Sequence, residues 1–185
     1  MPTLAEIEAD AKTCVACPLA AGRTQVVFAG GNPAAELMFV GEAPGKDEDL
    51  MGEPFVGRSG KLLDRLIAEE LGIDRSGYYI ANVVKCRPPG NRDPLPDEMA
   101  TCRHWLDSQI ELVGPKVIVT LGNVATKSLL GTTEGITRLR GRVHPYRDGI
   151  VLVPTFHPSA GLRSGGAVVA DMRADLIRAK RALTP

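Results

Sequence analysis

The sequence lacks an excess of charge of either sign. Its 22 basic and 22 acidic side chains give a formal net charge of zero, so overall charge gives no argument for nucleic-acid binding. No stretch contains about 18 consecutive apolar residues, and no membrane-spanning helix is therefore expected. Residues 1–14 are acidic and lack the basic start and apolar core of a signal peptide. These absences predict a cytoplasmic protein whose thiols stay reduced.

Two common phosphate-binding motifs are also missing, although the loop at 41–64 is rich in glycine. A P-loop requires serine or threonine after its glycine-lysine pair, but leucine follows the pair at 60–61. A dinucleotide-binding fingerprint fails as well, because Gly41 is followed by Glu42 and Ala43. The loop is therefore not expected to bind ATP or NAD.

Helical and strand-like segments alternate along the chain. The apolar spacing predicts helices over 3–13, 59–71, 97–112, 123–130 and 167–182, and strands over 36–40, 78–84, 116–121 and 151–154. Asp97 is expected to cap the third of these helices. The alternation predicts a mostly parallel sheet with helices on both faces, and a chain of 185 residues suggests a single domain, 1–185.

Unusual polar residues and glycines follow the predicted strands. Gly41 and Glu42 follow the first strand, Asn82 stands near the end of the second, Gly122 follows the third and His157 follows the last. The carboxyl ends of parallel strands meet at one edge of a sheet, and ligands bind there. The sequence therefore predicts one binding site that combines these residues.

Four cysteines form a second candidate site. Cys14 and Cys17 make one tight C-x2-C pair, whereas Cys86 and Cys102 are widely spaced. In a reducing compartment, this pattern is consistent with an iron–sulfur cluster, with a zinc site, or with buried free thiols. A structural metal site would tie the N-terminal segment to a strand end and a helix, and would clamp the proline-rich loop 87–101.

Arginines are concentrated towards the C-terminal part of the chain, at positions 138, 140, 142, 147 and 163. A basic strip on a neutral protein can follow a phosphate backbone, whereas a solvated charged face is the alternative interpretation. His104 and His144 have no motif around them, and both are expected to be surface or structural residues.

The combination of motifs resembles the family 4 uracil-DNA glycosylases, the iron–sulfur branch of their superfamily. The motifs are GEAPGKDEDLMGEPFVGRSGKLLD at 41–64, NVVKCRPPGNRDPLPDE at 82–98 and FHPSAGLR at 156–163, together with the four cysteines. The resemblance implies a three-layer α/β/α fold around a mostly parallel, four-stranded sheet. It also implies a structural [4Fe–4S] cluster held by the metal ligands Cys14, Cys17, Cys86 and Cys102.

The resemblance further implies a base-excision repair enzyme that flips uracil out of DNA and hydrolyses its N-glycosidic bond. Its catalytic residues would be Glu42, His157 and Asn91, and its uracil-binding residues Gly41, Glu42, Ala43, Phe55, Asn82 and His157. Phe55 would stack on the base, and His157 would donate a hydrogen bond to uracil O2. Glu42 would position water and stabilise the sugar cation. An oriented Asn82 amide would match the donor and acceptor of uracil and mismatch those of cytosine.

Contacts with DNA follow from the same resemblance. Ser59, Gly60 and Lys61 open a helix whose amides can bind a phosphate, and Leu162 or Arg163 would fill the space left by the flipped base. The expected partner is uracil-containing DNA, single- or double-stranded, and the protein is expected to be a monomer.

Several alternatives are open to test. One superfamily branch forms a covalent adduct through a histidine before an Arg-Gly pair, but Leu139 occupies that place here, so a monofunctional, non-covalent enzyme is expected. A non-catalytic iron–sulfur module that binds nucleic acid would have no use for Glu42 and His157 at strand ends. A zinc-stabilised hydrolase of free nucleosides would contain zinc instead of iron.

Overall fold

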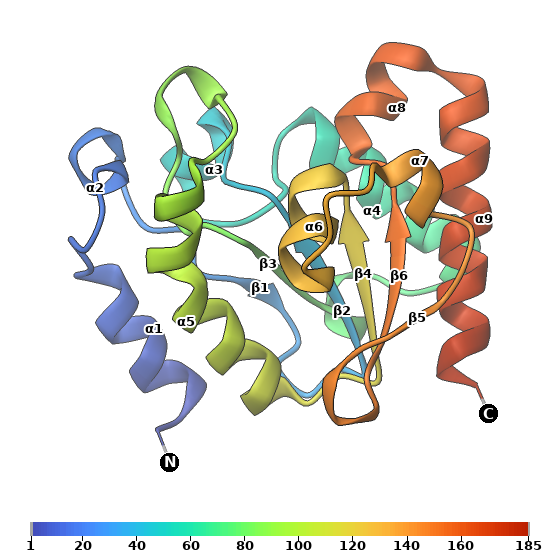
Figure 1. Ribbon diagram of the computed structural model, residues 1–185, viewed down its shortest axis with the longest axis horizontal. Helices are drawn as coiled ribbons and strands as arrows, with labels where there is room; N and C mark the ends of the chain where they lie inside the picture. The colour runs from blue at the N-terminus through green and yellow to red at the C-terminus, as the bar shows by residue number, and fades with distance from the viewer. Residues whose placement is uncertain (1, 185) are drawn as a thin grey trace.

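The computed structural model describes residues 2–184 and contains a six-stranded sheet in the order β1-β3-β2-β4-β6-β5 (Figure 1). The strands are β1 (Gly30–Gly31), β2 (Leu37–Gly41), β3 (Tyr79–Asn82), β4 (Val117–Leu121), β5 (His144–Pro145) and β6 (Val151–Thr155). The α-helices are α1 (Leu4–Lys12), α2 (Leu19–Gly22), α3 (Lys46–Met51), α4 (Arg58–Leu71), α5 (Pro96–Val113), α6 (Asn123–Leu130), α7 (Ile136–Leu139), α8 (Pro158–Ser164) and α9 (Gly166–Leu183).

The four central strands β3, β2, β4 and β6 are parallel, and the prediction of a mostly parallel α/β sheet is confirmed. The predicted number of strands is corrected from four to six, because β1 and β5 add antiparallel pairs at the two edges. Each edge strand is two residues long, and two residues show no alternation of apolar and polar positions.

The two faces of the sheet bury different sets of side chains. Along β2, Met38 and Val40 point to the face covered by α1, α5 and α6, whereas Leu37 and Phe39 point to the face covered by α4 and α9. Figure 1 shows α1 and α5 on one side of the sheet and α4 and α9 on the other. Because both faces are covered, all five β2 residues are buried, and the three-layer arrangement follows.

Some boundaries differ from the predicted ones. Helix α5 begins at Pro96, not at Asp97 as predicted, because proline fits the first helical position, where no amide donor is needed. The Glu98 carboxylate accepts the amide of Leu95 at 2.8 Å and so replaces the expected Asp97 cap. Helices α2, α3, α7 and α8 were not predicted, since each is too short for a clear periodicity. Within 2–184, no helix combines the length and apolar character needed to cross a lipid bilayer.

The carboxyl ends of the parallel strands lie together at one edge of the sheet, at the top of Figure 1. Gly41 ends β2 beside Asn82, which ends β3, and the loop after β6 carries His157. Glycines shape this edge, because Gly122 after β4 has a φ of 90° and leaves no room for a Cβ beside His157. The fold therefore brings the predicted strand-end residues to one place.

Candidate active site and cysteine site

A wide cleft occupies this edge of the sheet. Eight of the residues predicted from the sequence to form the site line it: Glu42, Ala43, Phe55, Ser59, Asn82, Asn91, His157 and Arg163. Gly41 lies directly behind the cleft, whereas Gly60, Lys61 and Leu162 are not part of its wall. Gly60 is buried against the Phe55 carbonyl, and Lys61 and Leu162 are exposed nearby. The structure thus gathers most of the predicted catalytic and base-binding residues in one cleft.

Phe55 forms an aromatic wall of the cleft in an unusual backbone conformation. Its φ is 55°, a left-handed value that costs a bulky residue about 1–3 kcal/mol. Arg75 opposes this cost by donating hydrogen bonds to the carbonyls of Pro54, at 2.7 Å, and of Phe55. A Cβ on Gly60 would lie 1.7 Å from the Phe55 carbonyl oxygen, so only glycine fits beneath it. The ring is therefore held firmly, and its centroid lies 5.9 Å from that of His157.

Asn82 presents an unpaired amide oxygen at the floor of the cleft. The residue is 1% exposed, and its Oδ1 has no hydrogen-bond partner among the described residues. Such an orphaned acceptor is costly unless a ligand supplies the donor. A Cβ on Gly41 would lie 2.5 Å from this oxygen and 2.4 Å from the Phe55 ring, so glycine permits their close approach. The arrangement fits a flat ligand that carries an N–H group.

His157 is held in one neutral tautomer. The backbone amide of Ser159 donates to His157 Nδ1 at 3.1 Å, and an amide can only donate, so Nδ1 is an acceptor and Nε2 carries the hydrogen. The Ser159 hydroxyl also lies 2.8 Å from Nδ1, and Arg163 donates to that hydroxyl at 3.3 Å. Burial, assisted by the positive charge of Arg163, lowers the pKa of His157 to about 4. At neutral pH the imidazole is therefore an uncharged Nε2–H donor in the wall of the cleft.

Glu42 has a carboxyl neighbour that sequence reasoning did not identify. Burial and then the negative charge and hydrogen bond of Asp93 raise the pKa of Glu42 to about 7. Asn91 was predicted to act together with Glu42 as a catalytic residue, and its amide oxygen accepts a hydrogen bond from Arg87 at 2.7 Å. Asn91 still lines the cleft, and its φ of 55° turns the chain so that Asp93 follows beside Glu42. Asp93 lies within the motif quoted at 82–98, so the sequence shows an acidic residue there but does not show that it lies beside Glu42.

Two other acidic residues of the loop at 41–64, Glu48 and Asp49, are structural. Glu48 accepts the amides of Gly45, Val56 and Gly57 at 2.9–3.1 Å and so fixes the loop around α3. Asp49 is buried and accepts the Thr24 amide at 2.8 Å. The many carboxylates of this stretch therefore have separate roles, and Glu42 is the one with a raised pKa in the cleft.

The arginines do not form one free basic strip. Arg140 binds Asp175 and Asp171 at 2.9 and 3.3 Å and lies over the Phe156 ring, next to His157. Arg147 pairs with Asp107 at 3.1 Å, which leaves fewer unpaired cations than the sequence suggested.

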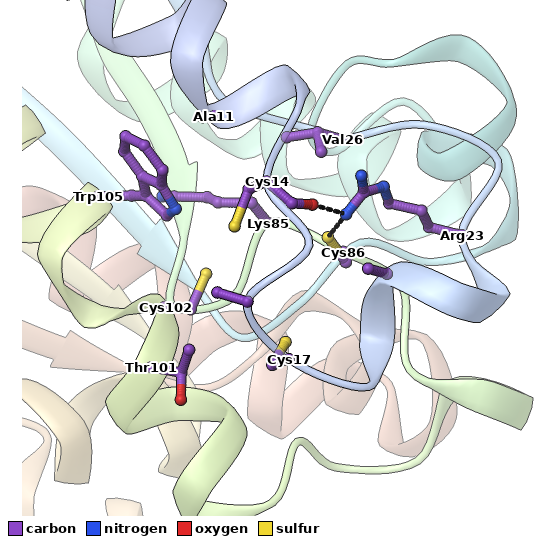
Figure 2. Close-up of a pocket in the computed structure, with 12 residues that line it drawn as sticks. Ala11, Cys14, Cys17, Arg23, Val26, Lys85, Cys86, Thr101, Cys102 and Trp105 are labelled. Atoms are coloured by element: carbon purple, nitrogen blue, oxygen red, sulfur yellow. Dashed lines mark hydrogen bonds between the residues drawn. The ribbon is translucent and has the colours of Figure 1, made fainter.

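The four cysteines face a common space (Figure 2). Cys14 follows α1, Cys17 precedes α2, Cys86 follows β3 and Cys102 lies in α5. The pocket they line encloses about 320 Å³ free of protein atoms, counting the part open to solvent, and its remaining wall is largely apolar. Burial raises the pKa of the Cys86 thiol and raises that of Cys102 to about 11, so thiolates here need a bound cation.

Two metal groups have ligand requirements that four cysteine thiolates can meet. Around a single zinc ion, four sulfur atoms would each lie about 2.3 Å from the metal. Within residues 2–184, no group of three or more Cys, His, Asp or Glu side chains is already arranged to hold a metal ion. In a [4Fe–4S] cluster each thiolate binds a different iron, which keeps the thiolates further apart. The all-cysteine donor set around a shared pocket fits a [4Fe–4S] cluster, and four thiolates are also a known donor set for zinc.

Two basic residues approach the cysteine pocket from opposite directions. Arg23 donates to the Cys14 carbonyl at 2.6 Å and to Cys86 Sγ at 3.4 Å (Figure 2). Lys85 lines the pocket from the protein interior and is 1% exposed. Neither residue was singled out from the sequence, because a single lysine or arginine beside a cysteine carries no spacing signal.

Comparisons with known proteins agree with this site. The family model described as "Uracil DNA glycosylase superfamily" matches residues 28–179. This range contains the whole cleft and two of the four cysteines, Cys86 and Cys102. The shared part of the chain is therefore the part that builds the candidate active site.

Several relatives are similar over most of their length, and each is named "Type-4 uracil-DNA glycosylase". The protein of Thermotoga maritima is 50% identical over 83% of this chain and 80% of its own. The protein of Sulfurisphaera tokodaii is 48% identical over 88% of this chain and 77% of its own. The protein of Saccharolobus solfataricus is 44% identical over 88% of this chain and 78% of its own. The chain belongs to the uracil-DNA glycosylase superfamily and, within it, to the type-4 branch.

Proposed function

We propose that this protein excises uracil from DNA and leaves an abasic site for base-excision repair. The observation that carries the proposal is the buried, unpaired Oδ1 of Asn82, which shares a cleft with the Phe55 ring and His157. Uracil offers the N3–H donor that this oxygen lacks, and its O4 accepts the amide hydrogen of the same side chain. Cytosine has the opposite pattern and would leave both buried groups unpaired, which gives strong discrimination.

Bond cleavage places opposite charges at two points of the cleft. When the C1′–N1 bond breaks, its electron pair moves to the uracil ring, mainly to O2, and the sugar becomes cationic. The neutral His157 donates its Nε2–H to O2, and Glu42 stabilises the cation and accepts a proton from the water that attacks C1′. Phe55 supplies the stacking surface, worth about 1–3 kcal/mol for a base. Ala43 and Asn91 complete the polar wall, and Gly41 supports it from behind.

The flipped nucleotide also needs contacts with the DNA strand. The first amides of α4, at Ser59 and Gly60, and the Lys61 side chain bind a phosphate in this proposal. Leu162 or Arg163 on α8 occupies the vacated space in the DNA, and both are exposed beside the cleft. These contacts can form with uracil in either single- or double-stranded DNA. The proposed enzyme acts as a monomer in the cytoplasm. Leu139 is 6% exposed and has no nucleophilic atom, which supports non-covalent turnover.

The cysteine site holds a structural [4Fe–4S] cluster in this proposal. Cys14, Cys17, Cys86 and Cys102 supply its thiolates, and the cluster joins the four segments that carry them. When bound, the cluster supplies cross-linking of these segments; the hydrolysis depends on the protein side chains of the cleft. Such a link stabilises the loop that carries Asn91 and Asp93, because Cys86 and Cys102 flank it.

The test uses an end-labelled oligonucleotide with a single uracil, treated with hot alkali after incubation with the iron-containing protein. Cleavage that requires alkali is expected with uracil and not with cytosine at the same position. Glu42→Ala and His157→Ala are expected to slow it strongly, and Asn82→Ala to weaken uracil selection. A lane without alkali, run in denaturant, is expected to contain no protein–DNA adduct.

Absence of cleavage by a protein with an intact cluster would contradict the proposal. In that case, retained affinity for the oligonucleotide would identify a non-catalytic iron–sulfur module. Zinc in place of iron, with activity on free nucleosides, would instead identify a nucleoside hydrolase.

A further inference from the structure

Lys85 is a fully buried basic side chain whose known partners are neutral. Its Nζ donates to the Asn82 carbonyl at 2.7 Å and to Gln109 Oε1 at 2.5 Å. The lysine ion pairs found within residues 2–184 belong to Lys12 and Lys116, and the ionisable group facing Lys85 is the Cys102 thiol. A buried ammonium group is costly unless negative charge lies near it. The surroundings of Lys85 thus lack an anion at the place where its side chain borders the cysteine pocket.

We propose that Lys85 is a positioning residue that balances the charge of the cluster and couples cluster binding to uracil binding through Asn82. This inference rests on the proposed function. Four thiolates around a [4Fe–4S] core carry a net negative charge, and Lys85 lines the pocket that would contain them. The same ammonium group holds the backbone carbonyl of Asn82, the residue with the unpaired amide oxygen in the cleft.

The hydrogen bonds around Lys85 make this connection rigid. Gln109 on α5 accepts from Lys85, and its amide group donates to the Phe28 carbonyl at 3.0 Å and to the Tyr79 hydroxyl at 3.1 Å. The oxygen of Gln109 is thereby oriented towards Lys85, and the ammonium group is fixed relative to β3. Loss of the cluster charge would leave the ammonium group unbalanced, and a shift of Lys85 would disturb the Asn82 backbone. The structure thereby provides a direct route from the cysteine site to the base-binding floor.

Three variants separate the charge from the hydrogen bond. Lys85→Met removes both, Lys85→Gln keeps an amide donor but removes the charge, and Arg23→Gln is the matched control. Arg23 also touches the cysteine site, but its hydrogen bonds go to Cys14 and Cys86 and not to Asn82. Two quantities are measured on iron-containing protein: the rate at which a chelator bleaches the visible absorbance of the cluster, and the affinity for free uracil by calorimetry.

Lys85→Met is expected to bleach roughly tenfold faster and to bind uracil roughly tenfold more weakly. Lys85→Gln is expected to bleach as fast as Lys85→Met, with uracil affinity within roughly twofold of wild type. Arg23→Gln is expected to bleach faster with unchanged uracil affinity. Wild-type bleaching rates in both Lys85 variants would overturn the charge-balancing role, and wild-type uracil affinity in Lys85→Met would overturn the coupling.

A wild-type measurement covers the case in which Lys85→Met does not fold. Uracil affinity is compared before and after oxidative removal of the cluster, with circular dichroism to show that the protein remains folded. Weaker binding by the folded, iron-free protein supports the coupling, and equal binding contradicts it. A failure of the proposed function is distinguishable, because the wild type would then contain no iron or bind no uracil from the outset.

Discussion

The cleft and the cysteine site share neighbouring segments of the chain, but their walls differ in chemistry. In the cleft, polar groups such as Asn82 Oδ1 and His157 Nε2–H have no protein partner among residues 2–184, and the wall combines polar and apolar groups. In the cysteine site, four thiols face a pocket whose other walls are mostly apolar. One region stays open for a ligand that comes and goes. The other, in the proposed function, holds a cluster that remains bound.

Both sites contain groups that lower the stability of the folded protein, and they differ in what compensates for this loss. The unpaired Asn82 oxygen and the left-handed Phe55 backbone destabilise the cleft; in the proposed function a bound uracil pairs the oxygen, whereas Arg75 opposes the backbone cost. In the proposed function the cluster stays bound at the cysteine site, so the cost of burying the thiolates is offset throughout the life of the folded protein. We therefore expect changes in the cysteine site to affect stability first and changes in the cleft to affect rate first.

Removal of the cluster ligands is expected to have the largest effect. Cys86→Ala combined with Cys102→Ala should abolish iron binding and lower the free energy of unfolding by about 5 kcal/mol or more, comparable with the total stability of many domains. Iron content and thermal unfolding by circular dichroism measure this. Val15→Ser is the control, because Val15 is 78% exposed in the same segment. A double cysteine variant that melts like the wild type would contradict the distinction between the two regions.

His157→Ala is expected to affect rate instead of stability. Removing one prearranged donor to a developing oxyanion typically lowers the rate by about 10²–10³. Single-turnover cleavage of a uracil oligonucleotide should fall by this factor, while the thermal midpoint changes little. His104→Ala, at an exposed position, should match the wild type in both measurements. A large loss of stability with an unchanged single-turnover rate would instead assign His157 a structural role.

The Glu42–Asp93 pair predicts a moderate pH effect. The rate should rise as Glu42 ionises around pH 7, because the carboxylate form accepts the proton of water. The folded state holds this proton up to a higher pH than the unfolded state, so the pair's contribution to stability falls between about pH 4.5 and 7. His157, with a pKa of about 4, stays neutral throughout this range.

Asp93→Asn separates the two causes of this raised pKa. The substitution removes the neighbouring negative charge but leaves Glu42 buried, so the pKa of Glu42 falls without returning fully to its usual value. The acid limb of the single-turnover pH profile should move to lower pH, and stability at pH 8 should rise. An unmoved limb would show that burial alone sets the pKa of Glu42.

Much of this architecture could be predicted because burial leaves a periodic trace. The central strands and long helices of the core were expected from apolar spacing, and strand-end placement alone brought Glu42, Asn82 and His157 together. The edge strands, of two residues each, carry no such trace. The short helices α3, α7 and α8 are fixed by loop hydrogen bonds instead, such as those of Glu48.

The supporting contacts of the site could not be predicted, because they depend on the path of the loops. The turn at Asn91 decides that Asp93, and not Asn91 itself, is the neighbour of Glu42. The tautomer of His157 depends on the direction of the Ser159 backbone amide. The role of Arg75 depends on its hydrogen bond to the carbonyl of Pro54, which lies 21 residues earlier in the sequence. Residue type identified the chemistry, whereas three-dimensional structure was needed to identify what positions it.

Arg75→Lys is expected to have the smallest effect, because it changes how the Phe55 backbone is held without altering a residue that lines the cleft. Lysine keeps the charge beside Asp64 but cannot reach two carbonyls as a rigid fork. The free energy of unfolding should fall by about 1 kcal/mol, and uracil affinity by roughly threefold as the Phe55 ring loses its fixed position. Arg173→Lys is the matched control, since Arg173 binds Glu69 and Glu70 away from the cleft.

A similar loss of stability in both variants, with weaker uracil binding in Arg75→Lys alone, would show that the left-handed backbone of Phe55 is maintained for binding. Equal uracil affinity in the two would mean that Gly60 and the surrounding packing fix Phe55 without the arginine.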